Sequence, residues 1–157
     1  VLSIKHRDDS KSLIMLVSDI DMLARYVKEI PDIALDLIEV NDSPMSIIYP
    51  EAIVAKDSSP AGSALAPNVV SEDGSVGIRI PDNAFCKALI SRFGRAIVST
   101  SANISGSKAP TNYSEIQEEI IKSVDWVADP SLESSSTGKA SQIIKVGLRG
   151  EIAIIRG

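Results

Sequence analysis

Short apolar runs alternate with amphipathic stretches along the whole sequence, and this alternation limits the possible folds more than any other feature. Leu13 to Val17 and Ala96 to Val98 are nearly continuous apolar runs, the pattern of strands buried on both faces. Within 20–30, hydrophobic residues recur with the spacing of one helix face. Strands that alternate with helices favour an α/β fold with a mixed, mostly buried sheet.

The same patterns predict where the individual elements lie. We expect strands at 13–17, 46–49, 52–55, 76–80, 96–98, near Trp126, at 142–146 and at 152–155. We expect helices at 20–30 behind an Asp19 cap, from Pro31 through Ile38, from Asp82 or Asn83 to Gly94, and at 114–122. Residues 57–74 are rich in Ser, Pro, Ala and Gly, which predicts a loop.

Length, charge and residue types exclude several classes of protein. The 157 residues suit one domain with its own core, and no apolar stretch is long enough to span a membrane. The single cysteine, Cys86, excludes an internal disulfide and a cysteine-rich zinc site. A net charge of −5 argues against a general nucleic-acid coat, and no signal-peptide pattern is present, so we expect a cytoplasmic protein.

The cations are placed unevenly. Residues 28–73 hold nine acidic and two basic side chains. Several cations lie beside predicted strand ends, where open α/β sheets bind ligands; these are Lys5, Arg7, Lys11, Arg79, Arg149 and Arg156. Two interpretations stay open at this point: a cationic pocket for a small polyanion, or scattered solvated charge.

A serine-rich loop, residues 99–106, follows the predicted strand 96–98. Ser99, Ser101 and Asn103 carry hydroxyl and amide groups that, with free backbone N–H groups, can bind a phosphate or a carboxylate. The alternative is a turn whose side chains satisfy their own backbone. Ser136-Thr137-Gly138-Lys139 lacks the residues of a Walker A loop, and the only histidine, His6, cannot build a catalytic triad with another one.

Four segments recur in the order of one known family. They are Lys5-x-Arg7 with Lys11-Ser12-Leu13, Ser43 to Ile48, Val76-Gly77-Ile78-Arg79-Ile80-Pro81-Asp82, and Ser99-Thr100-Ser101-Ala102-Asn103-Ile104-Ser105-Gly106. With these segments the chain resembles the YrdC-type (TsaC) family, the L-threonylcarbamoyladenylate synthases, over essentially its whole length.

The resemblance implies a fold and a reaction. The fold would be a single-domain, twisted, open mixed α/β sheet with flanking helices, of the YrdC/RibB-like kind. The reaction would join L-threonine, bicarbonate and ATP into threonylcarbamoyl-AMP and pyrophosphate, with Mg²⁺ on the phosphates. The family members are nucleotidyltransferases whose product serves tRNA threonylcarbamoyladenosine modification, and tRNA would be met indirectly, through modification partner proteins. No membrane is implied.

The resemblance also implies roles for particular residues. Lys5 and Arg7 match the family's phosphate-binding pair, and Ser101 and Asn103 match its Ser-x-Asn pair, so these four would be catalytic. The remaining residues expected to bind ATP or its phosphates, by looser matches or by position, are Arg79, Ser99, Ser141 and Arg156. No residue is implied as a metal ligand.

Two alternatives and one departure accompany this resemblance. The chain could be a YciO-like protein that binds a nucleotide or RNA without synthase activity, or the carbamoyl-transfer module of a hydrogenase-maturation protein. The family normally has a Pro-Thr-Asp-Thr-x-Tyr-Gly-Leu segment before its Lys-x-Arg element, where only Val1 to Ile4 stand here. We therefore expect residues 1–157 to form one YrdC-like domain that lacks the family's N-terminal strand and part of its threonine site.

Overall fold

The structure is a computed structural model that describes residues 1–6, 13–134 and 136–157. Its backbone contacts divide the chain into two compact units. Unit 1 consists of Val1–Lys11 and Thr100–Ala140, and unit 2 of Ser12–Ser99 and Ser141–Gly157. Each unit is described by itself below.

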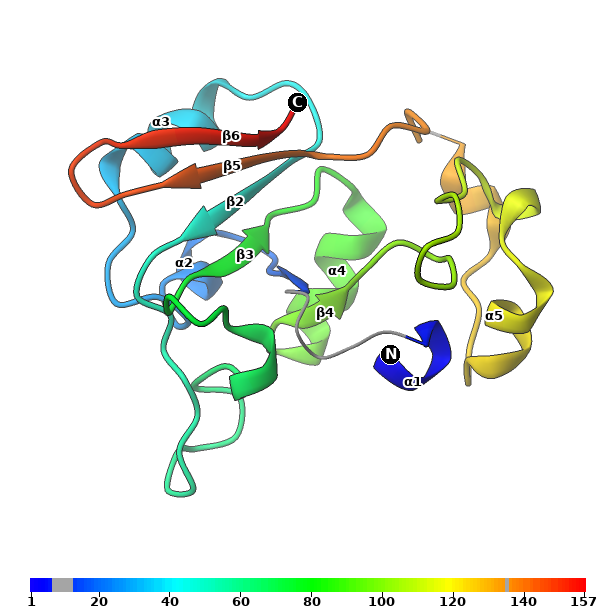
Figure 1. The fold of residues 1–157 in the computed structure, drawn as a ribbon, viewed down its shortest axis with the longest axis horizontal. Helices are drawn as coiled ribbons and strands as arrows, with labels where there is room; N and C mark the ends of the chain where they lie inside the picture. The colour runs from blue at the N-terminus through cyan, green and yellow to red at the C-terminus, as the bar shows by residue number, and fades with distance from the viewer. Residues whose placement is uncertain (7–12, 135) are drawn as a thin grey trace. The chain divides into compact units, whose positions relative to one another are not determined.

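Unit 2 is built on a six-stranded sheet with the strand order β4-β1-β3-β2-β5-β6 (Figure 1). The strands are β1 (Ile14–Leu16), β2 (Met45–Tyr49), β3 (Val76–Arg79), β4 (Ile97–Ser99), β5 (Gln142–Val146) and β6 (Ile152–Arg156). β1 pairs with β3, and β2 with β5, in parallel, whereas the other neighbouring pairs are antiparallel. The predicted α/β fold class, with a mixed open sheet and flanking helices, is confirmed.

Successive side chains of a strand point to opposite faces of the sheet. The two faces of this sheet differ in how far their side chains are exposed. One face carries Met15, Ile47, Ile78 and Ile144, all of them buried. In Figure 1 the helices of unit 2, α2 (Ile20–Leu23), α3 (Asp32–Val40) and α4 (Ala84–Phe93), lie behind the sheet. The other face, which we call the open face, carries half-buried side chains, namely Ile14, Leu16, Ile48, Arg79, Ile97, Ser99 and Ile143.

The helix predicted at 20–30 begins as expected and ends early. Asp19 is its N-cap, and the Asp19 carboxylate accepts a hydrogen bond from the Met22 N–H at 2.7 Å. The helix ends at Leu23, because the following backbone pairs with 51–53 instead. The Ile53 N–H donates to the Tyr26 carbonyl at 2.8 Å, and the Lys28 N–H donates to the Glu51 carbonyl at 3.1 Å. The prediction for 24–30 was therefore wrong.

The other two helices of unit 2 follow their sequence signals. Pro31 precedes α3, as its fixed φ favours. At the start of α4, the Asn83 side chain accepts a hydrogen bond from the Cys86 N–H at 2.9 Å. Gly94 ends α4 at φ 77°, a left-handed conformation that glycine adopts without steric cost.

Three strand predictions need correction. Residues 52–55 form isolated bridges, Val27 with Ala52 and Val54 with Leu65, and no strand of the sheet. The residues around Trp126 also lie outside any strand. The run 96–98 was expected to be buried on both faces, but β4 is an edge strand whose Val98 is 36% exposed.

Unit 1 contains short helices joined by long irregular segments. They are α1 (Leu2–Lys5), α5 (Glu118–Ser123), and two 3₁₀ helices, η2 (Tyr113–Glu115) and η3 (Pro130–Glu133). The predicted helix 114–122 is interrupted at Ile116 and Gln117, so only its second half is confirmed. No helix among the described residues is long and apolar enough to cross a membrane.

Candidate nucleotide site

Lys5 and the serine-rich loop, nearly a hundred positions apart in the sequence, meet in unit 1. Lys5 ends α1 and is 5% exposed. Its ammonium group donates to the carbonyl oxygens of Ser101, at 2.5 Å, and Asn103, at 2.6 Å. The Asn103 side-chain oxygen lies 3.4 Å from the same nitrogen. The structure thus brings together three of the four residues predicted to be catalytic.

The serine-rich loop is held by its own buried asparagine. The Asn103 amide nitrogen donates to the carbonyl oxygens of Ile104, at 3.1 Å, and Ser107, at 2.7 Å. The Ser105 N–H donates to the Lys5 carbonyl at 2.9 Å. Part of the loop therefore satisfies its own backbone, as the turn interpretation requires, while the Ser101 residue stays exposed.

The second member of the predicted cationic pair, Arg7, lies outside the described residues, as does Lys11. Lys5 alone represents the pair in the structure. It enters the cluster from α1, where His6 follows it in the left-handed conformation at φ 51°.

In unit 2, the strand register places the remaining candidates on the open face. Arg79 pairs with Leu16, and Leu16 pairs with Ile97. Ser99, two residues beyond Ile97 on β4, pairs with Ile14. Because alternate residues of a strand share a face, Ser99 and Arg79 lie on the same side of the sheet.

The register continues toward the other edge. Ile47 pairs with Ile78, so the next pair along β2 and β3 is Ser46 with Arg79. Ser46 in turn pairs with Ile143, and Ile143 with Arg156. A row of residues on neighbouring strands therefore runs across the open face from Arg79 through Ser46 to Arg156.

Ser141, Arg156 and Ser46 are joined by hydrogen bonds at the Arg156 end of this row. The Arg156 guanidinium donates to the Ser141 carbonyl from Nε at 2.9 Å and from Nη2 at 2.6 Å. Nη2 also lies 3.3 Å from the Ser141 hydroxyl, which is 3.0 Å from the Ser46 hydroxyl. The looser sequence matches, Ser141 and Arg156, thus lie in direct contact.

Ser46 was not predicted as a site residue. The available signal was a polar side chain within the apolar run Met45 to Tyr49, at a strand position that is 1% exposed. A buried hydroxyl in a strand interior requires a partner, and the partner here is a candidate site residue.

Arg79 is a half-buried cation on this face. Burial lowers the pKa of its guanidinium from the usual range, and the neighbouring Cys86 acts in the opposite direction. An arginine stays protonated at neutral pH despite such a shift. No carboxylate within the described parts of the chain forms an ion pair with Arg79, so its charge is available to an anion on the open face.

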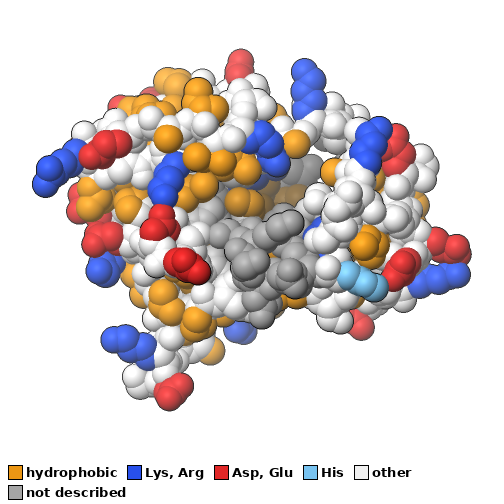
Figure 2. Space-filling view, in the orientation of Figure 1, with side chains coloured by type: hydrophobic (Ala, Val, Ile, Leu, Met, Phe, Trp, Pro, Cys, Tyr) orange, Lys and Arg blue, Asp and Glu red, His pale blue; other side chains and the backbone are white. Residues whose placement is uncertain are grey.

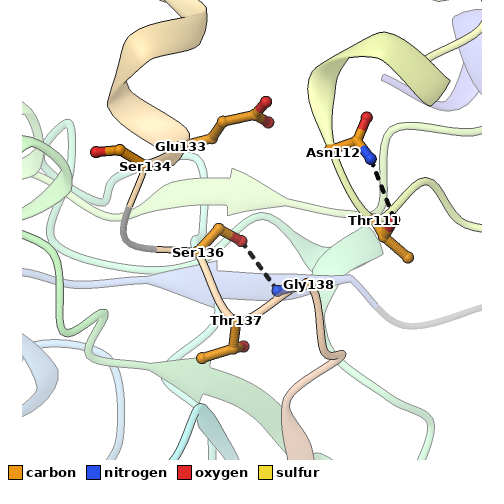
Figure 3. Close-up of a pocket in the computed structure, with 7 residues that line it drawn as sticks. All are labelled: Thr111, Asn112, Glu133, Ser134, Ser136, Thr137 and Gly138. Atoms are coloured by element: carbon orange, nitrogen blue, oxygen red, sulfur yellow. Dashed lines mark hydrogen bonds between the residues drawn. The ribbon is translucent and has the colours of Figure 1, made fainter.

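Unit 1 also contains a hollow of about 570 Å³ (Figure 3). Its lining residues are mostly polar and exposed: Thr111, Asn112, Glu133, Ser134, Ser136, Thr137 and Gly138. Glu133 accepts a hydrogen bond from the Tyr113 N–H at 2.7 Å, and Ser136 accepts one from the Gly138 N–H at 3.2 Å. None of the predicted site residues that the structure describes lines this hollow, and two of its lining side chains already accept hydrogen bonds from the protein.

The candidate residues do not make a metal site. They carry ammonium, guanidinium, hydroxyl and amide groups and no carboxylate. Among the described residues, no group of three His, Cys, Asp or Glu side chains could hold a metal ion. Such a donor set suits the phosphates of a metal–nucleotide complex better than a bare Mg²⁺ ion, which prefers carboxylate and water oxygens.

Comparison with known proteins identifies the family of this chain. The Sua5/YciO/YrdC family model, described as "Telomere recombination", matches residues 1–157. The chain belongs to the Sua5/YciO/YrdC family. The predicted YrdC-type resemblance is confirmed.

Curated relatives in this family carry a synthase name. A Methanocaldococcus jannaschii protein, named provisionally as a threonylcarbamoyl-AMP synthase, is 33% identical over 147 residues, which cover 93% of this chain and 62% of the relative. The threonylcarbamoyl-AMP synthase of Idiomarina loihiensis is 28% identical over 134 residues, 83% of this chain and 67% of the relative. The chain thus spans about two thirds of the length of these relatives.

Solved structures of the family share the fold. A doubly substituted P. abyssi Sua5 has a TM-score of 0.76 at 22% identity, covering 99% of this chain and 44% of that one. E. coli YciO has a TM-score of 0.70 at 18% identity, covering 99% of this chain and 70% of that one. P. abyssi Sua5 has also been solved in complex with L-threonine, with a TM-score of 0.69 at 24% identity over 92% of this chain and 39% of that one.

Proposed function

We propose that this protein is a threonylcarbamoyl-AMP synthase, which forms threonylcarbamoyl-AMP and pyrophosphate from L-threonine, bicarbonate and ATP. The observation that supports the proposal most directly is the contact between Lys5 and the Ser101–Asn103 segment. The synthase names of the curated relatives support the same activity.

The chemistry requires positioning and charge neutralisation rather than a protein nucleophile. The threonine amine and bicarbonate give a carbamate and release water. A carbamate oxygen then bonds to the α-phosphorus of ATP as the bond to the pyrophosphate oxygen breaks. Fixed cations and hydrogen-bond donors accelerate such a displacement by aligning the two oxygens and by stabilising the charge that develops on pyrophosphate.

In unit 1, the proposal assigns the phosphates to Lys5 and Arg7 and the acyl-phosphate end to Ser101 and Asn103. Among the described residues the Lys5 ammonium already has three oxygen neighbours, and an ammonium group has three hydrogens to donate. A phosphate oxygen would therefore replace one of these acceptors. The Asn103 side-chain oxygen, at the longest distance, is the one we expect to be displaced.

In unit 2, the proposal assigns Arg79, Ser99, Ser141 and Arg156 to the nucleotide. The open face presents these side chains on one side of the sheet, and two of them are arginines, whose guanidinium groups bind phosphate oxygens in pairs. The substrate is the magnesium complex of ATP, because the candidate residues contain no carboxylate to hold the ion. The adenylate would then pass to proteins that modify tRNA.

The proposal is tested by measuring pyrophosphate released from MgATP by the purified chain. Release should require L-threonine and bicarbonate together, and mass spectrometry should find threonylcarbamoyl-AMP. The Asn103→Ala and Arg79→Ala variants should lose this release. Lys122→Ala should keep it, because the Lys122 side chain is 71% exposed and pairs with Glu118 on the surface of α5.

Two results would contradict the synthase. ATP turnover that is indifferent to threonine would identify a different reaction. Binding of ATP or RNA with no pyrophosphate release would favour the YciO-like alternative, and salt dependence would then separate RNA binding from nucleotide binding.

A further inference from the structure

We propose that Ser46 is a positioning residue: its buried hydroxyl turns the Ser141 hydroxyl into a hydrogen-bond donor directed at an anionic oxygen of the nucleotide. This inference rests on the proposed function, which assigns Ser141 and Arg156 to ATP. It adds a role for a residue of β2 that the sequence did not single out as a site residue, and that role acts through Ser141.

The geometry follows from the strand register. Ser46 pairs with Ile143 across β2 and β5, and Ser141 stands two residues before Ile143. Ser46 and Ser141 are therefore diagonal neighbours on the open face, within reach of each other. Their hydroxyl oxygens lie 3.0 Å apart.

The direction of the hydrogen bond follows from burial. Ser46 is 1% exposed, and among the described residues its hydroxyl has one partner, the Ser141 hydroxyl. A buried O–H that donates to nothing costs about 1–3 kcal/mol. The arrangement that avoids this cost has Ser46 donating and the Ser141 oxygen accepting.

Arg156 occupies the second lone pair of the Ser141 hydroxyl oxygen, because a guanidinium can only donate. Its Nη2 lies 3.3 Å from the Ser141 hydroxyl oxygen, which has two lone pairs. With Ser46 and Arg156 as donors, both lone pairs of this oxygen are used. The hydrogen of the Ser141 hydroxyl is then left for an acceptor outside the cluster, and ATP offers acceptors on its phosphates and ribose.

The experiment is a double-mutant cycle on ATP binding, measured by titration calorimetry with the purified chain. Ser46→Ala should weaken ATP binding about 3- to 10-fold, the loss expected when one hydrogen bond is disordered. Ser141→Ala should weaken binding at least as much. The double variant should bind no more weakly than Ser141→Ala alone, because Ser46 acts only through Ser141.

Two further variants separate positioning from a structural effect. Ser46→Thr keeps the hydroxyl and should restore binding toward the wild-type value. Ser75→Ala removes another buried serine of unit 2, one that donates to Asp73 at 2.6 Å, and should leave ATP binding unchanged. Urea unfolding of each variant shows whether a change in binding follows a change in stability.

The outcomes distinguish this inference from the proposed function. Additive losses in the cycle, or no loss in Ser46→Ala, would overturn the positioning role even if pyrophosphate release is normal. Coupled losses in a chain that releases no pyrophosphate would support the positioning role and refute the synthase. Absence of ATP binding by the wild-type chain would overturn both.

Discussion

The buried ammonium of Lys5 is the contact whose removal should have the largest effect on unit 1. The change to test is Lys5→Met, which keeps the length of the side chain and removes its charge and its donors. Two carbonyl oxygens, on Ser101 and Asn103, would lose charge-assisted hydrogen bonds of 2.5 and 2.6 Å.

The magnitude can be worked from these two bonds. A hydrogen bond to a charged group contributes about 1.5–3 kcal/mol. Asn103 is buried, so its carbonyl oxygen would stay without water, whereas Ser101 is exposed and its carbonyl can find a new partner. The expected loss in the free energy of unfolding is therefore about 2–4 kcal/mol. This sum contains the full contribution of the buried hydrogen bond to Asn103 and a fraction of the contribution of the bond to Ser101.

Amide hydrogen exchange is the appropriate assay because it reports the loop itself. The N–H groups of Ser105 and Ser107 are bonded to the carbonyls of Lys5 and Ile104, at 2.9 and 3.0 Å. Their exchange should accelerate by about 30- to 700-fold, which corresponds to the same 2–4 kcal/mol.

Lys122→Met is the matched control, since an exposed helix pair contributes only about 0.3–0.5 kcal/mol. If Lys5→Met exchanges and unfolds like this control, the ammonium does not organise the serine-rich loop and the reasoning is refuted.

Three smaller predictions concern unit 2. The phenol of Tyr49 is 2% exposed and has no hydrogen-bond partner within residues 1–6, 13–134 and 136–157, and burial raises its pKa. Tyr49→Phe should therefore leave stability to urea unchanged or raise it by about 1 kcal/mol, and a loss of that size would reveal an unseen partner. Asn83→Ala removes the cap of α4 and should cost about 1 kcal/mol, seen as a lower urea midpoint; an unchanged midpoint would mean that the bond to the Cys86 N–H contributes nothing. The Lys145 ammonium holds the pKa of Asp73 well below its usual range, so the pair stabilises the fold above about pH 4 and less as the pH falls further. Asp73→Asn should flatten that acid-range decline in urea midpoint, and an unchanged decline would contradict the assignment.

Sequence motifs and tertiary contacts account for different parts of the candidate site. The motif match singled out Lys5, Ser101 and Asn103, and the structure brings these three together. The motif match could not show that the Lys5 ammonium would donate to the backbone carbonyls of Ser101 and Asn103, because those contacts depend on the conformation of the loop. It also missed Ser46, whose relevance depends on lying diagonally opposite Ser141 across two paired strands.

The exposure of the β6 side chains could not be predicted from the hydrophobic pattern. Ile152, Ile154 and Ile155 suggest a buried strand, yet they are 50%, 73% and 57% exposed, and Figure 2 shows hydrophobic side chains over β5 and β6. β6 is the last strand of the sheet, and an edge position leaves one side of a strand without a neighbour. The apolar pattern of a strand does not by itself give the strand's place in the sheet.

The sequence by itself determined the elements that depend on local chemistry. The Asp19 cap, a cap at Asp82 or Asn83, the helix end at Gly94 and most of the apolar strands could be predicted, because these signals act over a few residues. Tertiary structure alone decided the strand order, the early end of α2 and the meeting of Ser46, Ser141 and Arg156. Each of these depends on backbone pairing between segments far apart in the chain, which competes with local preference and overrides it where more hydrogen bonds are satisfied.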